Sequence, residues 1–217
     1  LDQTFEEDGR TLYANLGIGG RITPELSLLA RSRLSHDKRG EGADRLRHRM
    51  RVGAAYRPLE DDRFNALAWY EHRYDRQEQL DEQHLWSVAG TWRAGDRLRI
   101  NGKYAGQQSR FDTSAGTRVT GLMQMVQGGV NFDFVPNRFE AGVNAYHIWD
   151  NQGYSDSAIG IEGGLVAAKG TLLSVGYNFT RDKVPGEFVH YRDGLYIRLR
   201  LKLDETLWDQ LDRLWAD

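Results

Sequence analysis

Arginine recurs at every second position in two separate parts of the sequence. The segment "RLRHRMR" at 45–51 alternates arginine with other residues, and "YIRLRLK" at 196–202 does the same. Successive side chains of a β-strand point to opposite faces, so each segment would present a row of guanidinium groups on one face. Such rows can attract anionic solutes, or they can form packing networks with carboxylates. The charged residues expected on this polar face are Arg47, Arg49, Arg51, Arg73, Arg99, Arg198, Arg200, Glu71, Glu140 and Glu162.

Other reactive side chains show no recognisable pattern. Ser35 and His36 are adjacent, and neighbours on a strand point to opposite faces, so they cannot form a nucleophile and base pair. The six histidines lack the His-x-x-x-His spacing of a helical metal site. Cysteine is absent, which excludes disulfides, thiolate metal sites and thiol nucleophiles. We therefore expect no enzymatic activity, no cofactor and no metal site.

The pattern of apolar and polar residues predicts β-strands along the whole chain, and the charged rows lie on these strands. Eleven segments alternate apolar and polar residues, and most are about 9 to 15 residues long. Ordinary strands average about 5 or 6 residues, whereas a tilted strand that crosses a bilayer needs about 9 to 11. The expected strands are 11–22, 26–36, 45–57, 63–75, 83–93, 96–107, 117–134, 137–149, 157–168, 171–182 and 193–204.

The connections between these strands alternate between tight and long. In an up-and-down meander this alternation places every tight turn at one end, as in bacterial outer-membrane barrels with short periplasmic turns. A Greek-key sandwich mixes loop lengths at both ends. The tight connections lie near 24–25, 58–62, 94–95, 136–137 and 169–170, and the long ones at 37–44, 76–82, 108–116, 150–156 and 183–192.

Composition narrows the class of protein further. The 217 residues carry 29 Lys and Arg against 31 Asp and Glu, a net charge of -2 that disfavours a nucleic-acid partner. The mean hydropathy is -0.64, which normally indicates a soluble protein. A membrane barrel escapes that test because only every second residue of its strands meets lipid. Aromatic residues near expected strand ends would lie at the two membrane interfaces. These are Tyr56, Phe64, Tyr74, Trp86, Trp92, Phe132, Phe134, Phe139 and Trp149.

An odd number of strands raises the question of closure. Single-chain bacterial barrels have even strand counts, and an open edge cannot survive in lipid because its backbone groups have no water. We therefore expect at least one further strand, supplied by a segment upstream of Leu1 or by a partner chain, to give twelve or more. The alternative is a short irregular strand within residues 1–9.

The chain changes period after its last expected strand. We assign 1–204 to an antiparallel up-and-down transmembrane β-barrel and 205–217 to a periplasmic amphipathic helical tail. The tail could lie on the membrane interface, plug the lumen from below or bind a partner; a frayed terminus is the simpler alternative. The residues of the closing strand are Tyr196, Leu199, Leu201 and Leu203, and those of the tail are Leu207, Trp208, Leu211, Leu214 and Trp215.

Two segments near the end resemble a known class of domain. "LLSVGYNFTRD" at 172–182 and "HYRDGLYIRLRLKL" at 190–203 are similar to the last two strands of C-terminal outer-membrane barrels in large, repeat-bearing proteobacterial surface proteins. A weaker similarity covers 87–105. The resemblance implies a barrel that fixes a larger protein in the outer membrane. Such barrels commonly finish on an aromatic residue, whereas this strand ends at Leu203 and Asp204.

Three functions are consistent with these patterns. The first is a non-enzymatic outer-membrane barrel that anchors, or helps to export, a larger surface protein. The second is an anion-selective channel with an arginine-lined lumen, similar to small oligogalacturonate-type or sialate-type channels. The third is a soluble β-barrel binding module. The expected partners are outer-membrane lipid, the segment or chain that supplies a further strand, and a periplasmic or surface protein bound through the tail or the long loops.

Overall fold

The computed structural model is all-β in the part of the chain that it describes. The described residues are 2–6, 9–39, 44–58, 60–61, 63–77, 80–113, 116–136, 138–168, 171–180 and 193–201. The expected tail and Leu203 lie outside these residues. Within the described part, no helix is long and apolar enough to cross a membrane.

Twelve strands lie within the described residues, and each of the eleven expected strands has a counterpart. They are β1 (Asp2–Glu6), β2 (Gly9–Arg21), β3 (Leu26–Arg39), β4 (Arg45–Tyr56), β5 (Phe64–Arg76), β6 (Leu80–Arg93), β7 (Leu98–Asp112), β8 (Arg118–Val135), β9 (Phe139–Asp150), β10 (Ser155–Ala168), β11 (Thr171–Thr180) and β12 (Gly194–Leu201).

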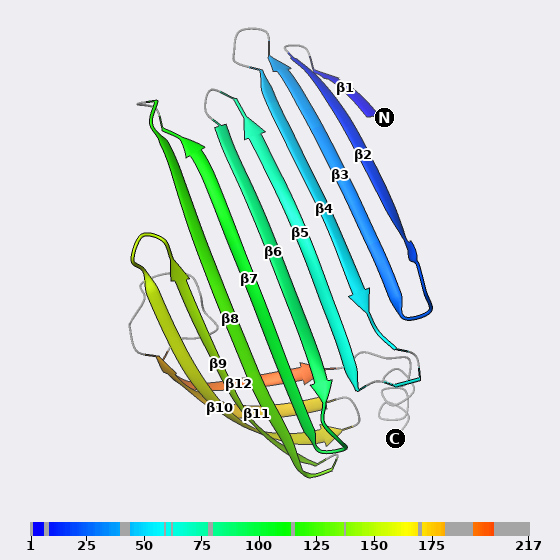
Figure 1. The fold of residues 1–217 in the computed structure, drawn as a ribbon, viewed down its shortest axis with the longest axis vertical. Helices are drawn as coiled ribbons and strands as arrows, with labels where there is room; N and C mark the ends of the chain where they lie inside the picture. Colours follow the sequence, from blue (N-terminus) through cyan, green and yellow to red (C-terminus); the bar gives the residue numbers. More distant parts are fainter. Residues whose placement is uncertain are drawn as a thin grey trace, which may run out of the picture. The chain divides into compact units, whose positions relative to one another are not determined.

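The strands form one sheet in strict chain order. Neighbours in sequence are neighbours in the sheet from β1 to β12, which is the expected up-and-down meander. Figure 1 shows β2 to β6 side by side as long arrows of alternating direction. The order is linear, with β1 and β12 at its ends, so closure into a barrel stays a prediction.

Strand β1 is the short strand within residues 1–9 that the sequence analysis gave as the alternative to a strand from upstream. Asp2 to Glu6 pair with Tyr13 back to Gly9 in antiparallel register. This strand brings the count among the described residues from eleven to twelve, an even number as closed bacterial barrels require. The further strand expected from upstream of Leu1 or from a partner stays a prediction.

The expected alternation of tight and long connections is wrong. The connection expected to be long at 76–82 is only 77–79, because β5 runs to Arg76 and β6 begins at Leu80. The connection expected to be tight at 58–62 spans 57–63. At these strand ends polar residues occupy both faces, so the hydrophobic alternation stops before the backbone pairing does. Loop length therefore does not orient the sheet.

The strand registers separate the side chains into two faces. From β2 to β6, even-numbered residues lie opposite even-numbered ones and odd opposite odd. We call the even-numbered side, with Leu16, Ile18 and Val52, the apolar face, and the odd-numbered side the polar face. In β10 to β12 the parity is reversed, so that Ile161, Val175 and the other odd-numbered residues form the apolar face.

Burial is inverted relative to a water-soluble domain. On β11 the apolar-face residues Val175 and Phe179 are 48% and 53% exposed, whereas Ser174 and Asn178 on the polar face are buried. On β2, Leu16 and Ile18 are more than two thirds exposed. Among the described residues the buried apolar side chains are only Ala158 and Leu172. On β11 the packed side is therefore polar and the bare side apolar, and on β2 the apolar side chains are likewise bare.

The chain divides into two compact units, which are described separately below. Unit 1 comprises Leu1–Trp92, Asn101–Gln127 and His147–Ser155. Unit 2 comprises Arg93–Ile100, Gly128–Tyr146 and Asp156–Asp217.

Candidate functional site: the polar face

Strand register gathers the arginines of unit 1 into two cross-strand rows. In one row Arg33 lies opposite Arg49, and Arg49 opposite Arg73. In the next row Arg31 lies opposite Arg51, and Arg51 opposite Glu71. Like charges directly opposite one another destabilise a sheet unless a counter-charge lies between them. Glu71 provides that counter-charge for the two rows.

Glu71 is the centre of an ion-pair cluster, and its side chain is only 1% exposed. It accepts a hydrogen bond from Arg49 Nε at 2.8 Å and another from Arg73 Nε. Arg51 Nε lies 3.1 Å from Glu71 Oε2 as an ion pair, without the geometry of a hydrogen bond. A buried carboxylate is stabilised only where cations surround it closely. We call Glu71, Arg49, Arg51 and Arg73 the arginine cluster.

The arginine cluster carries an excess of positive charge. Three guanidinium groups share one carboxylate, and their side chains are between 44% and 50% exposed. The face of the Trp69 ring lies 4.4 Å from the guanidinium carbon of Arg51 and restrains it. Arg31 adds a further cation beside the cluster and donates to Asn15 Oδ1 at 3.3 Å. The cluster can therefore stabilise an anion on the exposed side of these guanidiniums.

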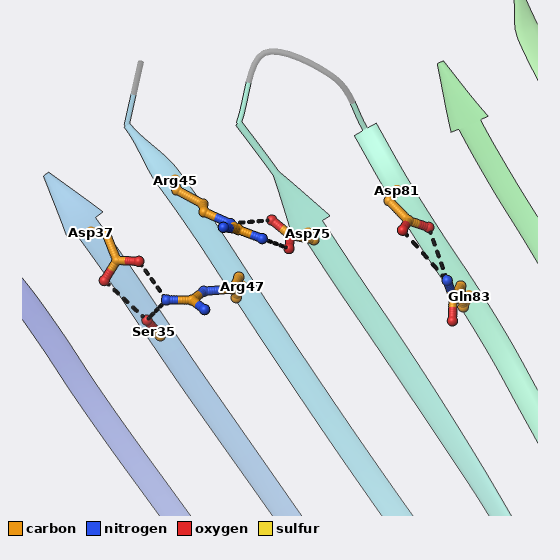
Figure 2. Close-up of polar contacts among 7 residues, drawn as sticks. All are labelled: Ser35, Asp37, Arg45, Arg47, Asp75, Asp81 and Gln83. Carbon is orange, nitrogen blue, oxygen red and sulfur yellow. Dashed lines mark hydrogen bonds and ion pairs between the residues drawn. The ribbon is translucent and has the colours of Figure 1, made fainter. Parts of the chain in front are cut away.

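Toward the ends of β3 to β6, the polar face has balanced ion pairs instead. Arg45 Nε donates to Asp75 at 2.9 Å, and Arg47 lies 2.5 Å from Asp37. Figure 2 shows both pairs, with Ser35 joining Arg47 to Asp37. Arg45 was not among the expected residues of this face, although it continues the alternation of Arg47. Here each arginine has its own carboxylate.

The described surface of unit 1 includes two large grooves. One has a volume of ≈ 780 Å³ and is lined by Asn15, Arg33, Arg47, Arg49 and Arg73, among others. The second has a volume of ≈ 720 Å³ and an almost wholly apolar lining that includes Leu29 and Trp69. The arginines therefore border a space large enough for a small solute, next to an apolar one.

Unit 2 has a smaller and more tightly packed polar cluster. Glu162 Oε2 accepts a hydrogen bond from Tyr196 Oη at 2.8 Å and lies 2.8 Å from Arg198. The guanidinium of Arg198 lies 5.2 Å from the centre of the Tyr196 ring. A Cβ atom at Gly176 would come within 2.4 Å of Tyr196, so this ring packs directly on the glycine backbone. The cluster joins β10, β11 and β12.

The remaining expected residues lie apart from these clusters or outside the described side chains. Arg99 lies in β7 and is half-buried. Glu140 in β9 lies against Gly164, where an added Cβ would be 3.3 Å from Glu140 Cγ. Leu199 is exposed on the apolar face. Arg200 and Leu201 are placed by backbone register alone, opposite Leu172 and Thr171.

A second polar cluster lies on the apolar face and was missed by the sequence reasoning. His72, Glu82 and His84 come together through the pairing of β5 with β6. The signal was present, because His72 and His84 lie at equal distance from the connection at 77–79. A helical His-x-x-x-His pattern does not include a pair that a hairpin brings together.

Ser35 and His36 point to opposite faces as expected, and a different serine and histidine come together. Ser35 hydrogen bonds to Asp37 on the polar face, whereas His36 lies 3.6 Å from Asp44, so the adjacent residues do not meet. Instead, Ser32 Oγ is 3.0 Å from His48 Nε2 on the apolar face. The ring of His72 lies edge-on to His48 at 6.2 Å.

Comparisons with known proteins identify outer-membrane barrels of similar strand arrangement. No protein-family model matches the chain, and no curated protein matches it significantly. Three solved structures share the arrangement at low identity. A KdgM porin in complex with disordered oligogalacturonate is 10% identical over 91% of this chain and 98% of that one, with a TM-score of 0.45. A NanC porin is 12% identical over 90% and 98%, with a TM-score of 0.49. The β domain of the Bordetella autotransporter BrkA is 14% identical over 93% and 95%, with a TM-score of 0.31. At these levels the matches carry no functional argument.

Proposed function

We propose that this chain is an outer-membrane β-barrel that holds a larger surface protein in the membrane. One observation carries the proposal, which is the inverted burial of the strands. On β11 the bare face is apolar and the packed face polar, and in unit 1 Leu16, Ile18 and Val52 are exposed on the apolar face. Exposed apolar surface of this extent marks a contact with lipid or with another protein. Lipid fits it best because the pattern recurs in both units and in strands long enough to cross a bilayer.

The soluble binding module is disfavoured by the same observation. A soluble barrel fills its interior with apolar side chains and turns polar ones to water. Here Glu71, Ser87, Ser174 and Asn178 are buried, whereas Leu16 is 73% exposed. Anchoring is the role that lipid contact alone supplies, and it agrees with the resemblance of 172–182 and 190–203 to anchoring barrels.

A test of this proposal is the behaviour of the whole chain toward membranes and detergent. We expect it to fold only in detergent micelles or lipid vesicles, to migrate faster on gels before boiling than after, and to resist extraction by urea. A monodisperse folded monomer in detergent-free buffer would contradict the proposal.

The arginine cluster favours a second function, the passage of anions. Arg33, Arg49 and Arg73 form a row with Glu71 as the nearby counter-charge, and the guanidiniums are about half exposed. A network that served packing alone would balance its charges, as Arg45 and Asp75 do. Rings of arginine set a preference for anions in pores.

Conductance in planar bilayers distinguishes a closed anchor from a channel. A channel would show a reversal potential that indicates anion preference, and replacing Arg49 and Arg73 with glutamine would reduce that preference. Arg57→Gln is the matched control, because Arg57 lies beyond the end of β4. An insulating barrel, or a preference unchanged by the double substitution, would exclude the arginine-lined path.

We propose no enzymatic activity for the barrel. Ser32 and His48 are within hydrogen-bond distance, but the next described neighbour of His48 is the ring of His72. A serine nucleophile needs its histidine base oriented by a third group, usually a carboxylate. Hydrolysis of ester substrates by the purified barrel, lost in Ser32→Ala, would contradict this.

A further inference from the structure

The apolar face carries a polar patch of one tyrosine, two histidines and a glutamate. Tyr70, His72, Glu82 and His84 all belong to that face, near the connection at 77–79. His72 and His84 are directly opposite each other, and their rings stack with centres 4.8 Å apart. Glu82 is a carboxylate on the side of the sheet where hydrophobic residues predominate. Placing such a group there is costly unless a cation lies beside it, and Arg110 at 3.4 Å is one such cation.

Three ligand atoms converge in this patch. Glu82 Oε1 lies 3.1 Å from His72 Nε2 and 3.5 Å from His84 Nε2. The ligand atoms that the three residues offer all lie within 4.8 Å of one another. Metal to ligand bonds near 2.0 to 2.1 Å in a tetrahedral zinc site place neighbouring ligand atoms about 3.3 Å apart. The two separations from Glu82 already match that spacing.

Neighbouring residues orient the ligands in the way that metal sites require. Tyr70 Oη lies 2.7 Å from His84 Nδ1, which leaves Nε2 of that ring directed at Glu82. Arg110 lies 3.4 Å from the second oxygen of Glu82 and leaves Oε1 for the histidines. Partners of this kind fix the ring orientation and tune metal affinity. His48 is not counted as a ligand, because its Nε2 is bonded to Ser32.

The side chains of the patch are accessible but not fully solvated. Those of His72 and Glu82 are 21% exposed, and that of His84 is 34% exposed. An ion could therefore reach them without unfolding of the strands. Each residue lies on a strand rather than on a loop, so the three ligands are held in place by the paired backbone of β5 and β6.

We propose that His72, Glu82 and His84 form a site for a divalent transition metal, with zinc as the preferred ion. Two imidazoles and one carboxylate are the ligand set of many zinc sites with an open fourth position. The ion would link β5 to β6 on the face opposite the arginine cluster. The open position would accept water or a ligand from a partner at the membrane surface. The site depends on neither the anchoring nor the channel function.

The alternative is a hydrogen-bonded patch that binds no metal. In that case the ring of His72 donates a hydrogen bond to Glu82, and the three residues need no ion. Zinc would displace this hydrogen bond, so direct measurement of metal binding separates the two.

The test is titration of zinc into the refolded full-length chain in detergent micelles, after treatment with a chelator. We expect one ion per chain with a dissociation constant in the micromolar range or below. Glu82→Gln preserves shape and His72→Gln preserves hydrogen bonding, and each should weaken binding at least tenfold. Tyr70→Phe should weaken it several-fold by releasing the His84 ring. His36→Ala is the matched control, since His36 is an exposed histidine of the same face on β3, and it should bind as the parent does.

Cobalt provides a second readout that does not require stable variants. Cobalt bound by two imidazoles and a carboxylate in a tetrahedral site should give visible absorption bands, which zinc then displaces. Failure of the parent chain to bind zinc at millimolar concentration would overturn the proposal. So would binding that survives both Glu82→Gln and His72→Gln unchanged.

Discussion

Glu71 and His72 are neighbours on β5, and they belong to two clusters of opposite kind. Glu71 turns to the polar face, where three guanidiniums surround one buried carboxylate. His72 turns to the apolar face, where two imidazoles and Glu82 lie beside Arg110. These two adjacent residues therefore belong to clusters on opposite faces of the sheet. Side-chain direction along a strand, rather than position in the sequence, decides what each residue does.

The same contrast distinguishes the two faces elsewhere in the molecule. Gly176 on the polar face is packed against Tyr196, whereas Gly163 on the apolar face has nothing within 4 Å of an added Cβ. Substitutions on the polar face should therefore disturb packing and charge. Substitutions on the apolar face should matter only where lipid is present.

The largest effect is expected from Glu71→Gln. The change removes the carboxylate that accepts from Arg49 and Arg73, and the loss of these charge-assisted hydrogen bonds should cost about 3 kcal/mol after allowance for guanidiniums that are about half exposed. Urea unfolding in micelles would measure the loss in free energy of unfolding. Asp75→Asn is the control, because the Arg45 to Asp75 pair is about one third exposed and should contribute about 1 kcal/mol or less. Equal losses in the two variants would show that Glu71 does not organise the cluster.

Gly176→Ala should cause the next largest loss in the free energy of unfolding. Its Cβ would lie 2.4 Å from the Tyr196 ring and 2.7 Å from the carbonyl oxygen of Ile161. Overpacking of this kind costs about 1 to 3 kcal/mol. The matched substitution Gly163→Ala should leave the free energy of unfolding nearly unchanged. If both variants unfold like the parent, the polar face is not the packed side of β11.

A smaller effect is expected when aspartate replaces a residue of β2. Ile18→Asp places a carboxylate on the apolar face and should cost about 1 to 2 kcal/mol in lipid vesicles, less than arginine at the same depth. Gly17→Asp, one residue away, turns to the polar face opposite Arg31 and should be neutral or stabilising. If Gly17→Asp cost more than Ile18→Asp in vesicles, the assignment of lipid contact to the apolar face would be wrong.

Much of the fold could be predicted from alternation alone. The strand from Arg45 to Tyr56 was expected at 45–57, because arginine occupies every second position from Arg45 to Arg51 and mostly apolar residues lie on the other parity. Alternation does not locate a strand end where both faces are polar. For this reason β5 continues to Arg76 and β6 begins at Leu80, both beyond the expected ends.

The clusters could not be predicted because they depend on register. Arg49 and Arg73 meet at Glu71 only when β4 and β5 pair with Arg51 opposite Glu71. Alternation assigns each residue to a face but does not say which residue lies opposite it. His72 and His84 were recognisable only as a hairpin pair, since their separation in sequence matches no helical motif.

The central claim is that the apolar face contacts lipid, and the absence of cysteine from the chain permits a direct test. Single cysteines at Leu16, Gly17, Ile18 and Gly19 would each carry a fluorescent label in reconstituted vesicles. We expect quenchers attached to lipid chains to reach the labels at 16 and 18, and water-soluble quenchers to reach those at 17 and 19 more strongly. Equal access of the water-soluble quencher to all four labels, with no quenching by lipid, would contradict the account.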